Sequence, residues 1–346
     1  MPQEQQHQED LIRMMEETKA FAQLQPWTWL DDNDLFAFRL EGEEPVYCSV
    51  MGAGGDLSGI AFYSDSTGLQ GFVDTMEDRM DRVDLYFSQS SYILEMTDRE
   101  ELQRQEYETI RSSGVRFRGR GQWPSWMHLR PGYLPELPVP GEYAMLADWL
   151  KAAGQSALRL QKNPEHRQLL QTGHCMLFVF DQAGGVSEQK LDIEQELERS
   201  HLKETAHPVH HDLQVRSLRE QCRQMDQVWE IDAFYQGVPV EGDPPFVPLL
   251  LLMIDPGEGA VLGSHMAHPS TQAQEFQEYL FAHFSQHRQL PRQVVTTNSR
   301  LHGMLAPLLS RLGVEFVEVE ELFIIPHIKE QLREEIEEHF EPGPNG

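Results

Sequence analysis

The sequence predicts an α+β N-terminal domain followed by an α/β domain with a mixed sheet. In the first part of the chain, a helix-spaced apolar pattern precedes several short β-rich stretches, of which LFAFRL (35–40) is the first. In the last part, strands and helices alternate: a buried strand (248–254), a second strand (260–268), then helix, strand, helix, strand and an acidic final helix. This order favours helices packed on a sheet whose strands pair partly in parallel.

The length supports two or three compact units, because domains usually hold about 100–200 residues and the chain has 346. The middle of the chain is either a separate α+β segment or part of the C-terminal domain. The expected segments are an N-terminal α+β domain (8–150), a middle α+β segment (155–245), a C-terminal α/β domain (246–338) and a disordered tail (339–346).

Local patterns define the elements of the N-terminal domain. Apolar residues at helical spacing predict a helix near 8–24. The stretch PVYCSVMGAGGDLSGIAFY (45–63) predicts a hairpin, since its glycines lack the G-x-G-x-x-G spacing and lead into a second β-rich segment. A capping box of Thr97 and Glu100 predicts a helix that ends at Gly114.

The charge disfavours general nucleic-acid binding, which only a local basic patch could support. Asp and Glu number 56 against 28 Lys and Arg, a formal net charge of −28, so the summed field repels phosphate backbones. No apolar run approaches the ~18 residues of a membrane helix, and the polar N-terminus lacks a signal peptide's apolar region. The chain is therefore expected to be cytoplasmic, with no membrane partner and with nucleic acid disfavoured.

One stretch, VRFRGRGQWPSW (115–126), reverses the sign of the charge locally. In an extended strand its three arginines would share one face beside two tryptophans. One interpretation is an internal joint in which the arginines pair with the chain's own carboxylates. The others are a surface for an acidic partner or anion, and a site for single-stranded nucleic acid that stacks on the tryptophans. The candidate anion- or partner-binding residues are Arg116, Arg118, Arg120, Trp123, Trp126 and Arg130.

The order of elements in the last 100 or so residues resembles the ribonuclease-H-like fold. Enzymes of that fold place one carboxylate on the first strand and another near the end of the strand after the first helix, where two divalent ions bind. Asp255 is the candidate for the first position, but residues 296–299 (TTNS) offer no second carboxylate. Because Mg²⁺ prefers anionic oxygen ligands, the more economical interpretation makes Asp255 a turn residue before Pro256.

No metal or cofactor is expected. Four histidines crowd one polar segment, and His283 and His287 are spaced i,i+4 on a predicted helix, but neither group matches a C-x₂-C or HExxH pattern. Cys48 and Ser49 lie in an apolar strand without a neighbouring base. The four clustered histidines are His201, His207, His210 and His211.

The motifs YCSVMGAGGDLSGIAFY, DREELQRQEYETIRSSGVRFRGRGQWPSW with RPGY, and PFVPLLLLMIDPGEGAVLG occur in this order. This series resembles a family of uncharacterised bacterial proteins that join two domains of unknown function. The resemblance covers residues 8–150 and 165–335. It implies two domains and a bacterial origin, and it transfers no catalytic residue.

Two functional hypotheses follow. The first is a non-catalytic binding or regulatory protein, whose partner would be another protein. The alternative is a metal-dependent hydrolase or nuclease on a degenerate ribonuclease-H-like scaffold that uses Asp255.

Overall fold

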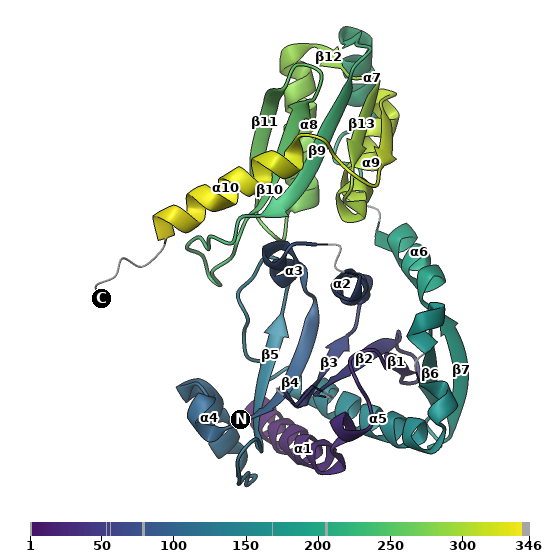
Figure 1. Ribbon diagram of the computed structural model, residues 1–346, viewed down its shortest axis with the longest axis vertical. Coiled ribbons are helices and arrows are strands. Elements are labelled where there is room, and N and C mark those ends of the chain that lie inside the picture. The colour runs from purple at the N-terminus through teal and green to yellow at the C-terminus, as the bar shows by residue number, and fades with distance from the viewer. Residues whose placement is uncertain are drawn as a thin grey trace. The chain divides into compact units, whose positions relative to one another are not determined.

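The computed structural model describes residues 2–52, 54–55, 57–77, 80–167, 169–204 and 207–340. The chain forms two compact units that interleave along the sequence. Unit 1 comprises residues 1–79, 89–130 and 135–199, and unit 2 comprises 80–88, 131–134 and 200–346. Each unit carries helices on a mixed sheet, which confirms the predicted fold class (Figure 1). No helix among the described residues is long and apolar enough to cross a membrane.

A seven-stranded sheet forms the centre of unit 1, in the order β5-β4-β3-β2-β1-β6-β7. Neighbouring strands are antiparallel except β1 and β6, which are parallel. The strands are β1 (Phe36–Arg39), β2 (Val46–Met51), β3 (Gly59–Tyr63), β4 (Ser91–Thr97), β5 (Trp123–Leu129), β6 (His174–Phe180) and β7 (Val186–Asp192). The inner strands β2 and β3 bury almost every residue, as strands covered on both faces do.

Helices α1 and α5 pack against each other and share one apolar core with Phe36, Phe62 and Trp126 of the sheet. A second core, on the opposite face, joins Ala37 of β1 to Phe72 of α2 and to the start of α6. The helices are α1 (Pro2–Leu24), α2 (Ser66–Met76), α4 (Arg104–Ser113), α5 (Tyr143–Lys162) and α6 (Ile193–Glu204), with short 3₁₀ turns at Pro26–Thr28, Arg99–Glu101, Pro164–His166 and Leu169–Thr172.

The local predictions for unit 1 are confirmed with shifted boundaries. β2 and β3 form the predicted hairpin, and the first helix begins at Pro2, earlier than expected. The helix predicted to start near Thr97 instead begins at Arg104. The first capping box is formed by Asp98 and Glu101, not by Thr97 and Glu100, and it closes only a 3₁₀ turn, whereas a second box, of Gln103 and Glu106, starts α4. It ends, as predicted, at Gly114, whose φ of 72° favours glycine.

Unit 2 is built on a five-stranded sheet in the order β11-β10-β9-β13-β14. β9, β10 and β11 are antiparallel to their neighbours in this group, whereas β13 is parallel to both β9 and β14. The strands are β9 (Val228–Tyr235), β10 (Leu249–Asp255), β11 (Ala260–Ala267), β13 (Gln293–Thr296) and β14 (Glu315–Glu318), and β8 (Arg223–Gln224) pairs separately with β12 (Gln289–Leu290).

One face of this sheet packs against α7, α8 and α9, and α10 lies on the other. The short helix α3, which comes from residues 80–88, also packs in unit 2, where Phe87 joins the core beside Tyr235. The helices are α3 (Arg82–Ser88), α7 (Asp212–Gln221), α8 (Gln272–His287), α9 (Ser299–Leu312) and α10 (Ile325–Phe340).

The structure divides the segment expected as a middle domain over 155–245. Residues up to 199 complete the sheet of unit 1 with β6 and β7, and the rest belongs to unit 2. Strand β9, which lies in that segment, is the first strand of the C-terminal sheet in chain order. The sequence had predicted that β10 would be the first. Helix α10 runs to Phe340, into the expected tail, and residues 341–346 lie outside the described part of the chain.

Candidate functional site

The arginine-rich stretch begins where α4 ends. Its first part, residues 115–122, belongs to no strand, and its last four residues start β5. Phe117 is buried in the core of unit 1, while Arg116 and Arg118 on either side of it are exposed. This alternation is that of an extended chain, as predicted. It stops at Gly119, whose φ of 108° is accessible mainly to glycine.

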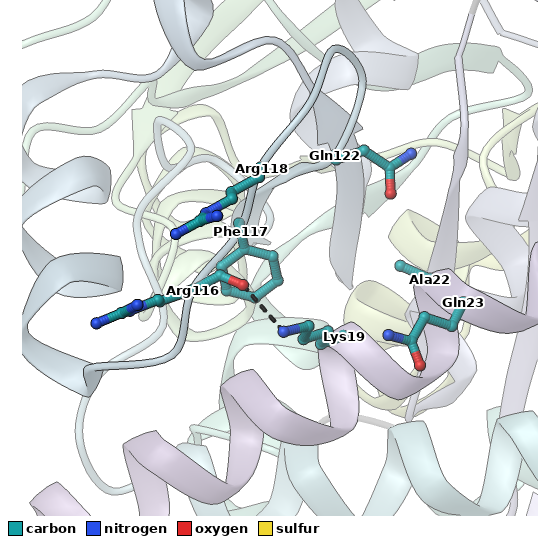
Figure 2. Close-up of a pocket in the computed structure, with 7 residues that line it drawn as sticks. All are labelled: Lys19, Ala22, Gln23, Arg116, Phe117, Arg118 and Gln122. Atoms are coloured by element: carbon teal, nitrogen blue, oxygen red, sulfur yellow. Dashed lines mark hydrogen bonds between the residues drawn. The ribbon is translucent and has the colours of Figure 1, made fainter.

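A groove separates this stretch from α1. It has a volume of about 480 Å³ and is lined by Lys19 and Gln23 of α1 and by residues 116–118 and Gln122 (Figure 2). An adjoining hollow of about 610 Å³ extends it along α1 towards residues 113–115. Both volumes lie within the ~300–1,000 Å³ range of ligand pockets.

One hydrogen bond joins the two walls. The Lys19 Nζ atom donates to the backbone carbonyl oxygen of Arg116 over 3.0 Å. In Figure 2 the guanidinium groups of Arg116 and Arg118 extend to one side of the stretch, and Lys19 and Gln23 lie on its other side. Cationic groups therefore flank residues 116–118 on two sides.

The arginines of this stretch differ in their charge partners. Among the described residues, neither Arg116 nor Arg118 forms an ion pair or a side-chain hydrogen bond. Arg120 lies beside Asp98, with 3.6 Å between Nε and Oδ2, but its side chain is 96% exposed. The interpretation of the arginines as an internal joint is thus not supported for Arg116 and Arg118, whose guanidiniums face solvent.

The other candidates of this stretch have structural surroundings. Trp126 is buried and stacks on Phe62, with ring centroids 6.4 Å apart, so its ring is not accessible to a ligand. Trp123 is half-buried near Phe117. Arg130 forms an ion pair with Glu136. The segment WPSW (123–126) forms the start of β5, an edge strand that tolerates Pro124.

No sequence pattern indicated Lys19 as part of this site. It is a single basic residue in the second half of α1, and only the packing of α1 beside residues 116–118 brings it to Arg116, 97 positions away in the chain. Gln23, one turn further along the same helix, was missed for the same reason.

Asp255 stands at the end of β10, where it acts as a turn residue. Its Oδ2 atom accepts a hydrogen bond from Gln227 over 2.9 Å, and its Oδ1 atom accepts one from the Gly257 amide over 2.9 Å. Among the described residues, no group of three or more His, Cys, Asp or Glu side chains converges as a metal site would require. Asp255 therefore has a local role in closing the turn to β11.

The two histidine groups noted in the sequence have different surroundings. His210 stacks on Phe281 with ring centroids 3.8 Å apart, and the side chain of His201 lies outside the described part of the chain. His283 and His287 do lie close, 4.4 Å between ring centroids, and burial together with the charge of His287 lowers the pKa of His283 to about 4.

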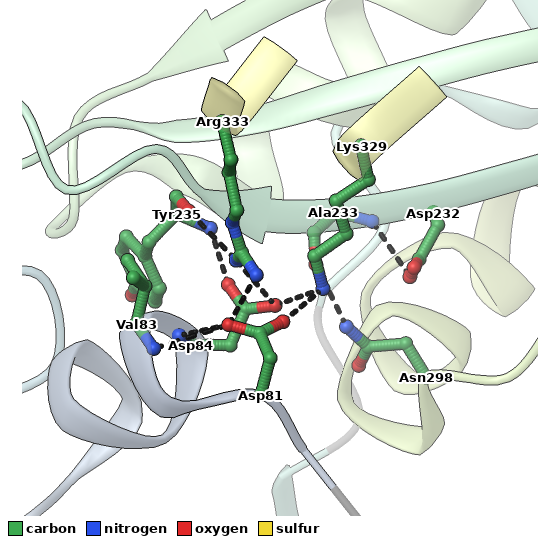
Figure 3. A network of polar contacts seen from close by, with 9 residues as sticks. All are labelled: Asp81, Val83, Asp84, Asp232, Ala233, Tyr235, Asn298, Lys329 and Arg333. Atoms are coloured by element: carbon green, nitrogen blue, oxygen red, sulfur yellow. Dashed lines mark hydrogen bonds and ion pairs between the residues drawn. The ribbon is translucent and has the colours of Figure 1, made fainter. Parts of the chain in front are cut away.

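A second group of charges lies in unit 2, where α10 meets α3 (Figure 3). Lys329 forms ion pairs with Asp81, at 2.6 Å, and with Asp84. Arg333 binds the same two carboxylates, and the Oδ1 atom of Asp84 accepts a hydrogen bond from the Tyr235 amide over 2.6 Å. These ion pairs and hydrogen bonds hold α3 and α10 against the end of β9.

The electrostatics of this group reflect burial and mutual attraction. Burial raises the pKa of Asp84 to about 6, and hydrogen bonds from Arg333 and Lys329 lower the pKa of Asp81 although its own burial opposes them. The nearby carboxylates raise the pKa of Lys329. The lysine therefore stays protonated over the physiological pH range.

Asp232 lies on β9, the first strand of the C-terminal sheet. Asp255 had been predicted to lie on that first strand. Burial raises its pKa to about 6, and Asn298, at the start of α9, lies close enough to donate to the carbonyl oxygen of Ala233 over 3.1 Å. β13, the strand of this sheet that follows α8, is therefore followed by the neutral amide of Asn298 and not by a carboxylate, as the TTNS stretch (296–299) predicted.

Glu230, two residues before Asp232, anchors the start of α10. Its carboxylate is buried and accepts hydrogen bonds from three consecutive amides, those of residues 323–325, over 2.8–3.1 Å. The amides at a helix N-terminus have no partner within the helix, so a carboxylate satisfies both their hydrogen bonds and the positive end of the helix dipole. Glu230 therefore fixes the position from which Lys329 and Arg333 reach α3.

Comparison with known families agrees with this division into two parts. Residues 12–213 match a family described as a domain of unknown function (DUF7309), and residues 214–333 match a second such family (DUF6930). These matches confirm the expected pair of domains of unknown function. No curated protein matches the chain. The first match includes residues 80–88, which pack in unit 2, so part of one matched region completes the fold of the other.

Proposed function

The chain belongs to the DUF7309 family, and we propose that it is a non-catalytic binding protein whose groove between α1 and residues 116–118 takes an anionic partner. The observation that carries this proposal is the place of Arg116 and Arg118: both are exposed, both line the groove beside Lys19, and neither forms an ion pair among the described residues. Their guanidiniums are therefore available to an external anion.

The overall charge shapes how such a partner would bind. The summed field of the protein repels anions at long range, so association depends on short-range contacts in the groove and not on steering. Contacts between exposed charges weaken as salt screens them, with a Debye length of about 8 Å at physiological ionic strength. Binding is therefore expected to be local to Lys19, Arg116 and Arg118 and to fall with added salt.

The hydrolase alternative receives less support from the geometry. Asp81 and Asp84 are held by Lys329 and Arg333, Asp255 closes a turn, and Asp232 faces the neutral Asn298. A pair of divalent ions would need several free anionic oxygens, and the described side chains here already have cationic or amide partners. The cytoplasmic location expected from the sequence is part of the binding proposal.

The test is a comparison of two double variants with equal loss of charge. Arg116→Ala with Arg118→Ala removes two of the three cations of the groove and leaves Lys19, and Arg104→Ala with Arg216→Ala removes two exposed helical arginines that pair with glutamates one turn away. Binding of fluorescein-labelled oligoglutamate, pyrophosphate and a single-stranded oligonucleotide is measured by anisotropy or competition at two salt concentrations.

We expect at least one of these anions to bind. The groove variant should bind it about tenfold or more weakly, and the control variant should bind it nearly as well as the unchanged protein. Equal losses in the two variants, or no measurable binding of any of the three probes, would overturn it. Because all four residues are exposed, loss of folding is not a competing explanation, and the melting temperature of each variant verifies this.

A further inference from the structure

We propose that the partner of this groove is an extended acidic peptide segment of another protein, which adds as a strand to residues 116–118. This inference rests on the proposed function and adds the class of partner and the mode of recognition. It depends on three features of the groove: the direction of its backbone groups, their free hydrogen-bonding capacity and the placement of its charges.

The direction follows from one observed hydrogen bond. In an extended chain the amide and carbonyl of one residue point to the same edge, and those of the next residue point to the opposite edge. The Arg116 carbonyl points towards Lys19, across the groove. The amide of Arg116 and both backbone groups of Arg118 therefore face the groove, and those of Phe117 face away.

These groove-facing groups are available. In the part of the chain that the structure describes, the amides of Arg116 and Arg118 and the carbonyl of Arg118 have no protein partner, and the Arg116 carbonyl has only Lys19. A carbonyl oxygen has two lone pairs and can accept a second bond. Residues 116–118 thus resemble a short sheet edge that lacks its neighbour, the arrangement on which strand addition depends.

The charges select an acidic peptide. Arg116 and Arg118 project from the same face of the extended stretch, so they lie opposite alternate side chains of an added strand, at distances their long side chains can span. Lys19 adds a third positive charge on the side of α1, with the amide of Gln23 beside it. The expected peptide carries Asp or Glu at positions i and i+2.

The same surroundings disfavour single-stranded nucleic acid. Such ligands are held by aromatic rings on which the bases stack, together with cations that follow the backbone. Here Phe117 and Trp126 are buried, and Trp123 is half-buried against Phe117. The accessible polar side chains beside residues 116–118 are therefore cations and amides, which suit carboxylates and a peptide backbone, and the one carboxylate nearby, that of Glu16, lines the adjoining hollow.

The experiment uses the full chain and labelled peptides with glutamate alternating with valine. One peptide is unmodified; in two others the backbone nitrogens of alternate residues are methylated, in one register or in the other. A strand pairs with its neighbour through the amides of every second residue, so methylation should matter in one register only. Affinity is measured by anisotropy for the unchanged protein, for Arg116→Ala with Arg118→Ala, and for the helical control variant.

The expected result is binding of the unmodified peptide, a loss of about tenfold or more on methylation in one register, little change in the other, and a comparable loss in the groove variant. Equal effects of the two methylation registers would overturn strand addition while leaving the anionic groove intact. Binding of an oligonucleotide, but not of the peptide, that depends on the two arginines would overturn the choice of partner. Failure of all anions to distinguish the groove variant would overturn the proposed function as well.

Discussion

Two pairs of basic residues in this protein have opposite surroundings. In unit 2, Lys329 and Arg333 each bind both Asp81 and Asp84, and their side chains are only 18–19% exposed. In unit 1, Arg116 and Arg118 face solvent, and no carboxylate in the described part of the chain pairs with them. The first pair stabilises the fold, because a buried charge is costly unless a neighbouring charge neutralises it. The second pair contributes little to the fold and is free to bind.

The largest expected effect comes from breaking the buried pair. Lys329→Met should lower the free energy of unfolding of unit 2 by about 3–5 kcal/mol, because removing one partner leaves buried carboxylates incompletely neutralised. Hydrogen exchange of the α10 amides, compared with those of α5 in unit 1, measures the loss where it occurs. Unchanged protection of α10 would contradict the distinction between the two pairs.

Removal of the carboxylate that anchors α10 should have an effect of similar kind. Glu230→Ala should destabilise unit 2 by about 3 kcal/mol, since three amides at residues 323–325 lose a charged acceptor. Glu230→Gln, which keeps one oxygen acceptor, should cost less than Glu230→Ala. Urea unfolding followed by hydrogen exchange reports the order of the three proteins, and equal losses in both variants would argue against the capping role.

Replacement of Asp232 should have the opposite effect and raise the stability of the protein. Its pKa is about 6 in the folded protein and lies near 4 in an unfolded chain, so the folded state holds the proton more tightly and stability falls as the pH rises from about 4 to 6. Asp232→Asn removes this penalty and should stabilise the protein at pH 7 by up to about 3 kcal/mol. Near pH 4 the variant and the unchanged protein should unfold alike.

A matched control for this pH profile is Asp226→Asn, whose side chain is 92% exposed beside Arg292. Its effect on stability should be small across the same range, because exposed ion pairs contribute little. A difference between Asp232→Asn and the unchanged protein that stays constant from pH 4 to pH 7 would show that the charge of Asp232 is not the cause.

The smallest effect is expected for the exposed pair. Arg116→Ala and Arg118→Ala should each change the free energy of unfolding by no more than about 0.5 kcal/mol, as is usual for surface positions without partners. The interpretation of these arginines as an internal joint predicts instead a clear loss of thermal stability. Thermal unfolding of the double variant decides between the two, and a large decrease would remove the basis of the binding proposal.

Much of the local structure could be predicted from the sequence. The hairpin of β2 and β3, the end of α4 at Gly114 and the alternation of the last strands and helices depend on neighbours a few positions apart, whose spacing the sequence displays. The first strand of the C-terminal sheet was predicted one strand too late, at β10, because the sequence could not show that β9 pairs beside β10. Asp232 was overlooked for this reason.

The candidate site shows the same division. By itself, the sequence determined that the arginines of 116–118 alternate with an apolar residue, and hence that they share a face, because side chains in an extended chain alternate. Only the tertiary structure decided that this face is solvent, that Lys19 reaches the carbonyl of Arg116, and that residues 80–88 complete unit 2. The contacts involved join residues far apart in the chain, 97 positions for Lys19 and Arg116 and 245 for Asp84 and Lys329. Such contacts depend on the packing of the whole unit, which cannot be predicted from neighbouring residues in the sequence.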